Sequence, residues 1–133
     1  MSATTGETGR PPTSQDSALR VRTRHAGAIP VIAVEGEVDL STVESVRDAV
    51  HCELKATQPQ GLILDLTGVT FLCSTGLQLL VDADRRMQDN GGALCVVGAR
   101  REVLRPLQLT GLDEHLHVYP TLEEALAQLP TTE

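Results

Sequence analysis

The stretch GLILDLTGVTFLCSTGLQLLVDADRRM, residues 61–87, carries most of the information about the fold. It begins with GLILDL, which is too apolar for a surface strand and predicts a strand buried on both faces over 62–66. From Thr75 onward, apolar and small residues recur at helical spacing and predict a helix over 75–89. A thiol and two hydroxyls, those of Cys73, Ser74 and Thr75, therefore lie together where a strand becomes a helix.

The segments on either side extend this unit into a sheet. NGG at 90–92 ends the helix, and ALCVV at 93–97 predicts a second buried strand, so that strand, helix and strand imply parallel neighbours. Upstream, the alternating segment LRVRTRH at 19–25 predicts a half-exposed edge strand, and VIAVEGEVD predicts a second strand after a turn. The fold class is therefore α/β, with a mixed β-sheet that opens with a hairpin and continues with alternating helices and largely parallel strands.

Helix boundaries follow from caps and breakers. Ser41 and Glu44 have the spacing of a capping box and predict a helix that runs to about Ala56. Thr121 and Glu124 repeat that spacing at the start of a final helix. Between them we expect a helix from about residue 100 to 111, kinked or divided by its proline, and a short strand over 114–119.

The domain organisation is simple. Residues 1–17 are rich in Thr, Ser, Gly and Pro and predict a flexible N-terminal tail. Residues 18–130 are expected to form one domain, with a core of aliphatic side chains because aromatic residues make up only 2% of the chain.

Composition excludes several classes of function. A net charge of -7 argues against binding to nucleic acid, and the scarcity of aromatic residues argues against base stacking. No apolar run approaches the roughly 18 residues of a membrane span, and the polar N-terminus has no signal peptide, so we expect a cytoplasmic protein without membrane contact. Three cysteines far apart suit reduced thiols. His115 and His117 would share a metal ion only from one face of a strand, and we expect neither a metal nor a cofactor.

The candidate site lies at the carboxyl ends of the parallel strands, where ligands gather in open sheets. Residues 67–76 occupy that position as a loop, with Asp39 and Ser41 beside them if the strands are neighbours. Ser74 or Thr75 can instead be a simple N-cap. A serine-hydrolase elbow is excluded because position 72 is Leu, and a Cys73 nucleophile lacks a recognisable histidine base. We therefore expect that the protein is not an enzyme.

A hydroxyl at an exposed helix start has a different use. Phosphorylation adds a charge of about -1.5 to -2, which the helix dipole tolerates. A partner that docks there does not tolerate it, so such a hydroxyl can switch binding without unfolding the protein.

Over residues 19–129 the chain resembles the bacterial anti-sigma-factor antagonists, which are STAS domains. VEGEVDLSTVESVRDAV at 34–50 is similar to the family's Gly-Glu-apolar-Asp turn and first helix. Residues 61–87 resemble its strand, switch loop and second helix, and residues 94–126 resemble the remainder.

The resemblance implies a partner-switching regulator of transcription in the stress response. Family members bind an anti-sigma factor with serine/threonine kinase activity and free the sigma factor. The kinase then phosphorylates the loop, and a serine phosphatase resets the cycle. The implied phosphoacceptor is Thr75, with Ser74 as second choice, in a monomer or weak dimer. The implied partner-binding residues are Asp39, Ser41, Cys73, Ser74, Thr75, Gly76 and Leu77.

Cys73 departs from the family, which has Asp at this position. It can be a tolerated replacement, or it can mark an antagonist that is poorly phosphorylated and binds persistently. It can also be a redox site, because a thiol at a helix start can be both accessible and acidified. A STAS signalling module without any sigma factor is a further alternative.

Overall fold

A computed structural model describes residues 19–129. The tail expected over residues 1–17 lies outside the described residues, as do positions 18 and 130 at the two ends of the expected domain. No helix within the described part is long and apolar enough to cross a membrane.

The sheet has five strands, and their order in space is their order in the sequence. They are β2 (Leu19–Ala26), β3 (Ile29–Val38), β4 (Gly61–Leu72), β5 (Ala93–Val97) and β6 (His117–Tyr119). The hairpin of β2 and β3 is antiparallel, and every later pair is parallel. The predicted mixed α/β fold is confirmed.

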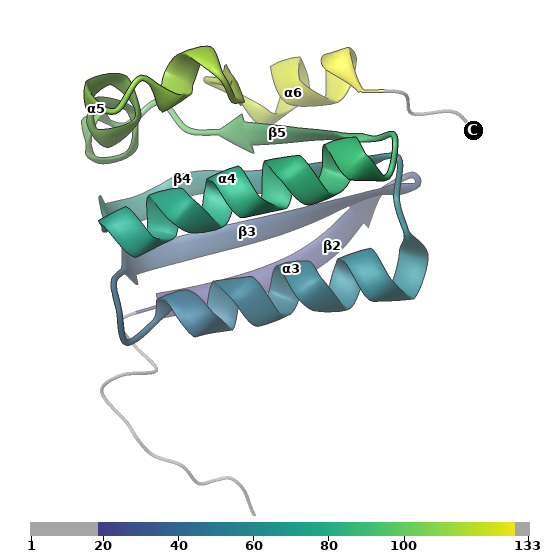
Figure 1. Cartoon of the computed structure of the whole chain (residues 1–133), viewed down its shortest axis with the longest axis horizontal. Coiled ribbons are helices and arrows are strands. Elements are labelled where there is room, and N and C mark those ends of the chain that lie inside the picture. Colours follow the sequence, from purple (N-terminus) through teal and green to yellow (C-terminus); the bar gives the residue numbers. More distant parts are fainter. Residues whose placement is uncertain (1–18, 130–133) are drawn as a thin grey trace, which may run out of the picture.

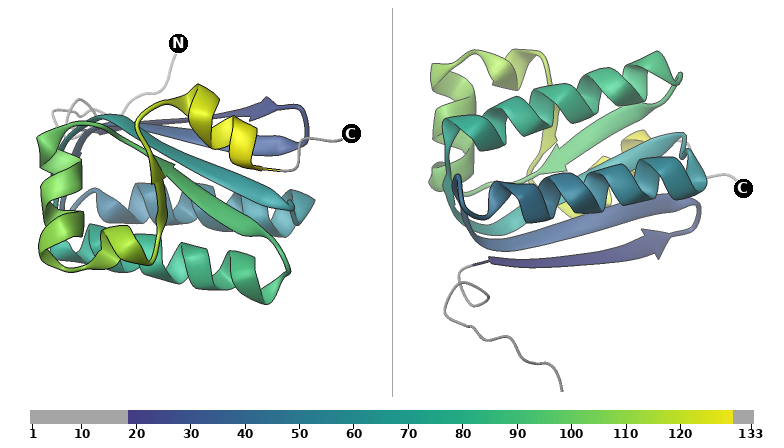
Figure 2. Two further views of the ribbon diagram at one scale, coloured as in Figure 1. Left: turned by 90° about the horizontal axis from the view of Figure 1, so that it is seen from above. Right: turned by 60° about the horizontal axis from the view of Figure 1, so that its bottom comes forward.

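Helices cover both faces of this sheet. α3 (Val43–Thr57) and α4 (Ser74–Asp89) lie side by side on one face, and the short α6 (Leu122–Gln128) lies on the other (Figure 2). α5 (Arg101–Leu109) and the 3-10 helix η1 (Leu112–Glu114) follow β5. The carboxyl ends of β3, β4 and β5 share one edge, at the left of Figure 1, and α5 stands beside that edge together with the first turn of α4. This arrangement places the carboxyl edge next to α5 and the start of α4.

The core is aliphatic, as predicted. Its larger part lies between the sheet and the helices α3 and α4, and its smaller part lies under α6. The most buried side chains include Ile32, Leu62, Leu64, Leu80, Met87 and Leu94. Each such side chain contributes about 1.5–3 kcal/mol on burial, which explains how the fold forms with so few aromatic residues.

β4 is longer than the sequence predicts. The expected strand ended at residue 66 and a loop was expected over 67–76, but β4 continues to Leu72. After register shifts, pairing with β3 resumes at Glu35 with Gly68 and ends at Val38 with Leu72. The polar residues Thr67 and Thr70 are exposed and lie at the two register shifts, where they have no partner in β3, so their composition suggested a loop although the residues around them are paired.

Three smaller predictions also need correction. α3 begins at Val43 after Thr42, without a side-chain cap, so Ser41 and Glu44 do not form a capping box. α5 continues through Pro106, so of the two predicted effects of the proline, division of the helix is wrong. The strand expected over 114–119 is limited to β6, because η1 and a turn occupy the preceding residues. Thr121 caps α6 as predicted, since its hydroxyl accepts from the N–H of Glu124 at 3.2 Å, but within residues 19–129 the reciprocal bond of a capping box, from the Thr121 N–H to the Glu124 side chain, is not formed.

Candidate functional site at the carboxyl edge

Two segments far apart in sequence meet at the carboxyl edge of the sheet. The last paired residues of β3 and β4 are Val38 and Leu72, and the backbone N–H of Cys73 donates to the carbonyl of Val38 at 2.9 Å. Residues 38–42 and 72–77 are thereby held side by side. The structure thus brings together the two segments that the sequence assigned to the candidate site.

Gly76 allows the start of α4 to pack tightly against both strands. A Cβ atom at this position would lie 2.8 Å from Cδ1 of Leu72 and 3.0 Å from Cγ1 of Val38. Both side chains belong to the core, so a methyl group would require Leu72 or the first turn of α4 to shift. The glycine sets the distance between the first turn of α4 and the strand ends.

Cys73 is the N-cap of α4. Its backbone is extended, and its Sγ accepts a hydrogen bond from the N–H of Gly76 at 3.4 Å. The alternative in which Ser74 or Thr75 caps the helix is therefore wrong. The thiol satisfies one of the backbone donors that every helix start leaves unpaired.

The hydroxyls of Ser74 and Thr75 consequently belong to the first turn of the helix. Ser74 is exposed and Thr75 is half-buried. Within residues 19–129, neither hydroxyl forms a hydrogen bond with another side chain or with the backbone. Both are chemically available, and neither contributes a hydrogen bond to the fold.

Asp39 organises the turn between β3 and α3. Its Oδ1 accepts from the Ser41 hydroxyl at 2.7 Å and from the backbone N–H groups of Ser41 and Thr42 at 2.9 and 3.1 Å. The hydrogen bond from the Ser41 hydroxyl is the main reason why the pKa of Asp39 lies below its usual value, while partial burial opposes the shift. The turn is thus a compact, charged structure, and it presents Leu40 to solvent.

Exposed apolar side chains accompany the hydroxyls. Leu40 is 76% exposed and Phe71 is 50% exposed, whereas Leu77 is only 8% exposed and packs into the core. Sequence reasoning included Leu77 among the partner-binding residues and omitted Leu40 and Phe71. The signal for Phe71 was the single phenylalanine of the chain, placed next to the small polar residues.

The remaining thiols and histidines do not join this site. Cys52 is exposed on α3, while Cys95 is buried in β5, where burial raises the pKa of its thiol to about 11. Among the described residues, no group of three or more His, Cys, Asp or Glu side chains is placed to hold a metal ion. His115 lies in a turn and His117 in β6, so the two do not alternate along one strand.

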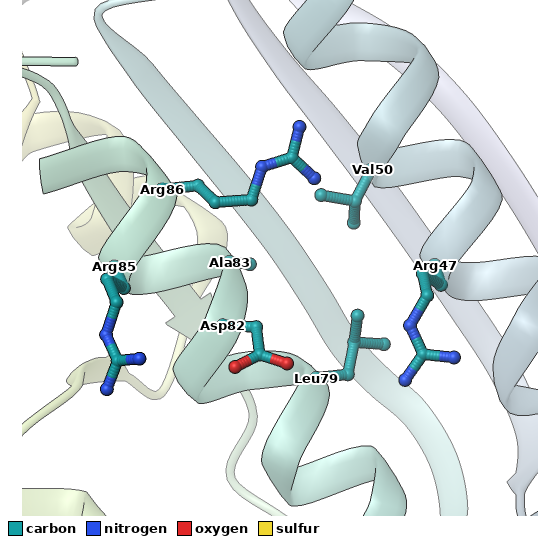
Figure 3. Close-up of a pocket in the computed structure, with 7 residues that line it drawn as sticks. All are labelled: Arg47, Val50, Leu79, Asp82, Ala83, Arg85 and Arg86. Carbon is teal, nitrogen blue, oxygen red and sulfur yellow. The ribbon is translucent and has the colours of Figure 1, made fainter. Parts of the chain in front are cut away.

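A separate groove of about 350 Å³ runs between α3 and α4. Figure 3 shows Arg47 and Arg86 approaching it from opposite helices over an apolar floor that includes Val50, while Arg85 points away. Arg47 pairs with Glu44, and Arg86 contacts the His51 ring at 3.4 Å. The guanidinium groups of Arg47 and Arg86 thus interact with side chains of the same molecule. The Asp82 carboxylate adds a negative group to the lining of the groove.

Comparison with known proteins agrees with the fold and with the sequence resemblance. The family model of the STAS domain matches residues 20–125. The anti-sigma-F factor antagonist RsfB of Mycobacterium tuberculosis is 30% identical over 113 residues, which cover 85% of this chain and 91% of that protein. The anti-sigma F factor antagonist of Paenibacillus polymyxa is 24% identical over 84% of this chain and 95% of its own. A crystal structure of an anti-sigma factor antagonist from Mycobacterium paratuberculosis superposes with a TM-score of 0.78 at 32% identity, covering 84% of this chain and 93% of that one.

Proposed function

The chain belongs to the STAS-domain family, and on that basis we propose that it is an anti-sigma-factor antagonist. It binds an anti-sigma factor that has serine/threonine kinase activity and thereby frees the sigma factor in the cytoplasm. Phosphorylation of Thr75 releases the kinase, and a serine phosphatase restores the binding form. The chain itself catalyses nothing in this cycle.

The main support for the proposal is that Cys73, Ser74 and Thr75 have different roles at the start of α4. Cys73 caps the helix, while the hydroxyls of Ser74 and Thr75 have no hydrogen-bond partner among residues 19–129. Modification of either hydroxyl therefore removes no stabilising contact. A phosphate at this point also interacts favourably with the helix dipole, so the fold is expected to survive the change.

The surroundings of Thr75 explain why a phosphate would release a partner. Leu40 and Phe71 offer exposed apolar area on the adjacent segments, and an interface that covers them excludes water. A phosphate in that interface must lose its hydration, which is costly without a cationic partner. The Asp39 carboxylate, whose pKa is lowered, already places negative charge nearby.

Cys73 is compatible with this cycle. Because its sulfur caps the helix, the first turn forms without the carboxylate that the family resemblance implies at this position. Its thiol is half-buried and engaged, so we expect modification at the hydroxyls rather than at the sulfur.

Phosphopeptide mapping tests the proposal. The full chain is mixed with each candidate anti-sigma kinase of its own genome and ATP, and intact mass and peptide mapping follow. We expect a gain of about 80 Da, one phosphoryl group, on Thr75, together with dissociation of the complex. Thr75→Val should bind the kinase but remain bound after ATP is added, whereas Ser74→Ala should behave like the wild type.

Other outcomes redirect the proposal in defined ways. Phosphate on Ser74 and ATP-dependent release of Thr75→Val would move the acceptor by one residue. A protein that never carries phosphate, and that gains an oxidative adduct on Cys73, would instead support a redox-responsive or unphosphorylated STAS module.

The Thr75→Glu variant distinguishes an effect of local charge on kinase binding from an effect of lost folded structure. We expect its affinity for the kinase to fall at least about tenfold, equivalent to 1.4 kcal/mol, because charge enters the docking surface. Its melting temperature should be equal to or above that of the wild type, because a negative charge suits a helix N-terminus. Undiminished affinity in calorimetry would contradict the mechanism.

A further inference from the structure

α5 has a buried face and a solvent face of different character. Val103 and Leu107, four residues apart, are fully buried against the core. The opposite side holds a shallow groove of about 370 Å³, lined by Arg101, Glu102, Arg105, Pro106 and Leu109. Leu109 is 76% exposed, although a leucine in this position could have been replaced by a polar residue without loss to the core.

The groove is also unusually basic for an acidic protein. The chain has a net charge of -7, yet three arginines occur within residues 100–105. Arg100 approaches Glu102 at 4.0 Å, whereas Arg101 and Arg105 form no ion pair with any residue of the described part. Two guanidinium groups without an ion pair among residues 19–129 thus lie next to exposed apolar area.

The helix that carries this surface lies at the same edge of the sheet as the candidate site. Leu40, Phe71 and Leu109 are the exposed large apolar residues of the described chain, and each lies on a segment that borders the carboxyl edge of the sheet. Figures 1 and 2 show α5 at the edge where α4 begins. A partner that covers Thr75 therefore reaches α5 without crossing the sheet.

We propose that the Arg101–Arg105–Leu109 face of α5 is a second docking site for the anti-sigma factor and that it receives an acidic segment carrying an apolar side chain. The apolar side chain packs on Leu109 and Pro106, and carboxylates pair with Arg101 and Arg105. This inference rests on the proposed function, since it takes the anti-sigma factor as the partner. It adds a site outside the hydroxyl-bearing turn, and one whose charge can select among anti-sigma factors.

Affinity measurements on the full chain test it. The probe is the purified anti-sigma kinase whose binding is lost in Thr75→Glu, and the variants are Leu109→Ala, Arg101→Gln and Arg105→Gln. We expect Leu109→Ala to weaken binding about tenfold and each arginine variant about three- to tenfold. The arginine variants should also reduce the dependence of affinity on ionic strength.

Lys55→Gln is the matched control. It removes one exposed positive charge from the last turn of α3, at the opposite end of the helices, and should bind like the wild type. All four side chains are solvent-exposed, so melting curves should be unchanged.

The outcomes distinguish this inference from the function on which it rests. If the α5 variants bind like the wild type while Thr75→Glu does not, the α5 site is overturned and the proposed function stands. An equal loss in Lys55→Gln would show a non-specific charge effect and also overturn it. If the wild type binds no anti-sigma factor, both proposals fail.

Discussion

The sulfur of Cys73 lies 3.4 Å from the backbone nitrogen of Gly76 and accepts its hydrogen bond. The residue that departs from the family pattern thereby caps the helix that carries the candidate acceptor hydroxyls. Gly76, at the other end of this bond, holds the same turn against Val38 and Leu72. Capping and close packing together define where Ser74 and Thr75 stand.

Replacing Cys73 should change helix stability according to the strength of the cap. Aspartate is among the preferred N-caps and also favours the helix dipole, so Cys73→Asp should raise the free energy of unfolding by about 0.5–1 kcal/mol. Cys73→Ala removes the acceptor and should lower it by a similar amount. Urea titration measures both, with the exposed Cys52→Ala as control. A Cys73→Ala protein as stable as the wild type would mean that the sulfur contributes no capping.

Gly76→Ala should destabilise the protein despite the better helix propensity of alanine. The added Cβ would approach Leu72 and Val38 to 2.8 and 3.0 Å. Overpacking of this kind costs about 1–3 kcal/mol, against a gain of about 1 kcal/mol in propensity, so we expect a net loss of up to about 2 kcal/mol. Ser74→Ala in the same turn is exposed and should change stability by less than about 0.5 kcal/mol. A Gly76→Ala protein more stable than the wild type would show that the turn can move outward freely.

The hydrogen bonds to Asp39 should make the free energy of unfolding depend on pH. Its folded-state pKa is lowered, chiefly by the hydrogen bond from the Ser41 hydroxyl, so its charged form is favoured by folding. The contribution is therefore present above the usual pKa of 3.8 and is lost as pH falls through the lower folded value. Wild type should be more stable than Asp39→Asn at neutral pH, and the difference should shrink below that pKa. Curves of unfolding free energy against pH that stay parallel would contradict this role.

The buried thiol of Cys95 should affect the free energy of unfolding at alkaline pH. Its pKa is about 11 in the folded chain against 9.0 as reference, so below pH 9.0 the thiol is neutral in both states. Between the two values only the unfolded chain loses the proton, and stability should fall by up to about 1.4 kcal/mol per pH unit. Cys95→Ala should show a shallower slope, even though the cavity lowers its stability at every pH. Alkylation should modify Cys52 rapidly and Cys95 only on unfolding.

Much of the fold was predictable because it depends on local patterns. The buried strands over 62–66 and 93–97 and the helix over 75–89 follow from runs and spacings of aliphatic residues, and the structure places them as β4, β5 and α4. The parallel order follows from the strand–helix–strand unit. The prediction that Asp39 and Ser41 follow a strand lying beside the segment 67–76 therefore agrees with the structure, in which Val38 pairs with Leu72.

The details of the site were less predictable, because they depend on contacts between distant segments. Thr67 and Thr70 suggest a loop by composition and have no partner in β3, yet the pairing of Gly68, Val69 and Phe71 with β3 keeps this segment within β4. Ser41 has the sequence spacing of an N-cap, yet its hydroxyl and its backbone N–H both donate to the Asp39 carboxylate in the turn before α3. Ser74 and Thr75 are better caps than cysteine on average, but the strand ends one residue before Cys73 and so assigns the cap to the thiol.

The sequence by itself determined that the core is aliphatic, where most of the helices and strands lie, and which edge carries the hydroxyls, because aliphatic spacing encodes these locally. Only the tertiary structure decided that β4 ends at Leu72, that Cys73 caps α4, and that Leu40, Phe71 and Leu109 rather than Leu77 face solvent. The physical reason is that each of these depends on a neighbour distant in the chain. Val38 determines where β4 stops and how closely Gly76 can approach, and no local pattern around residues 72–77 records where Val38 will lie.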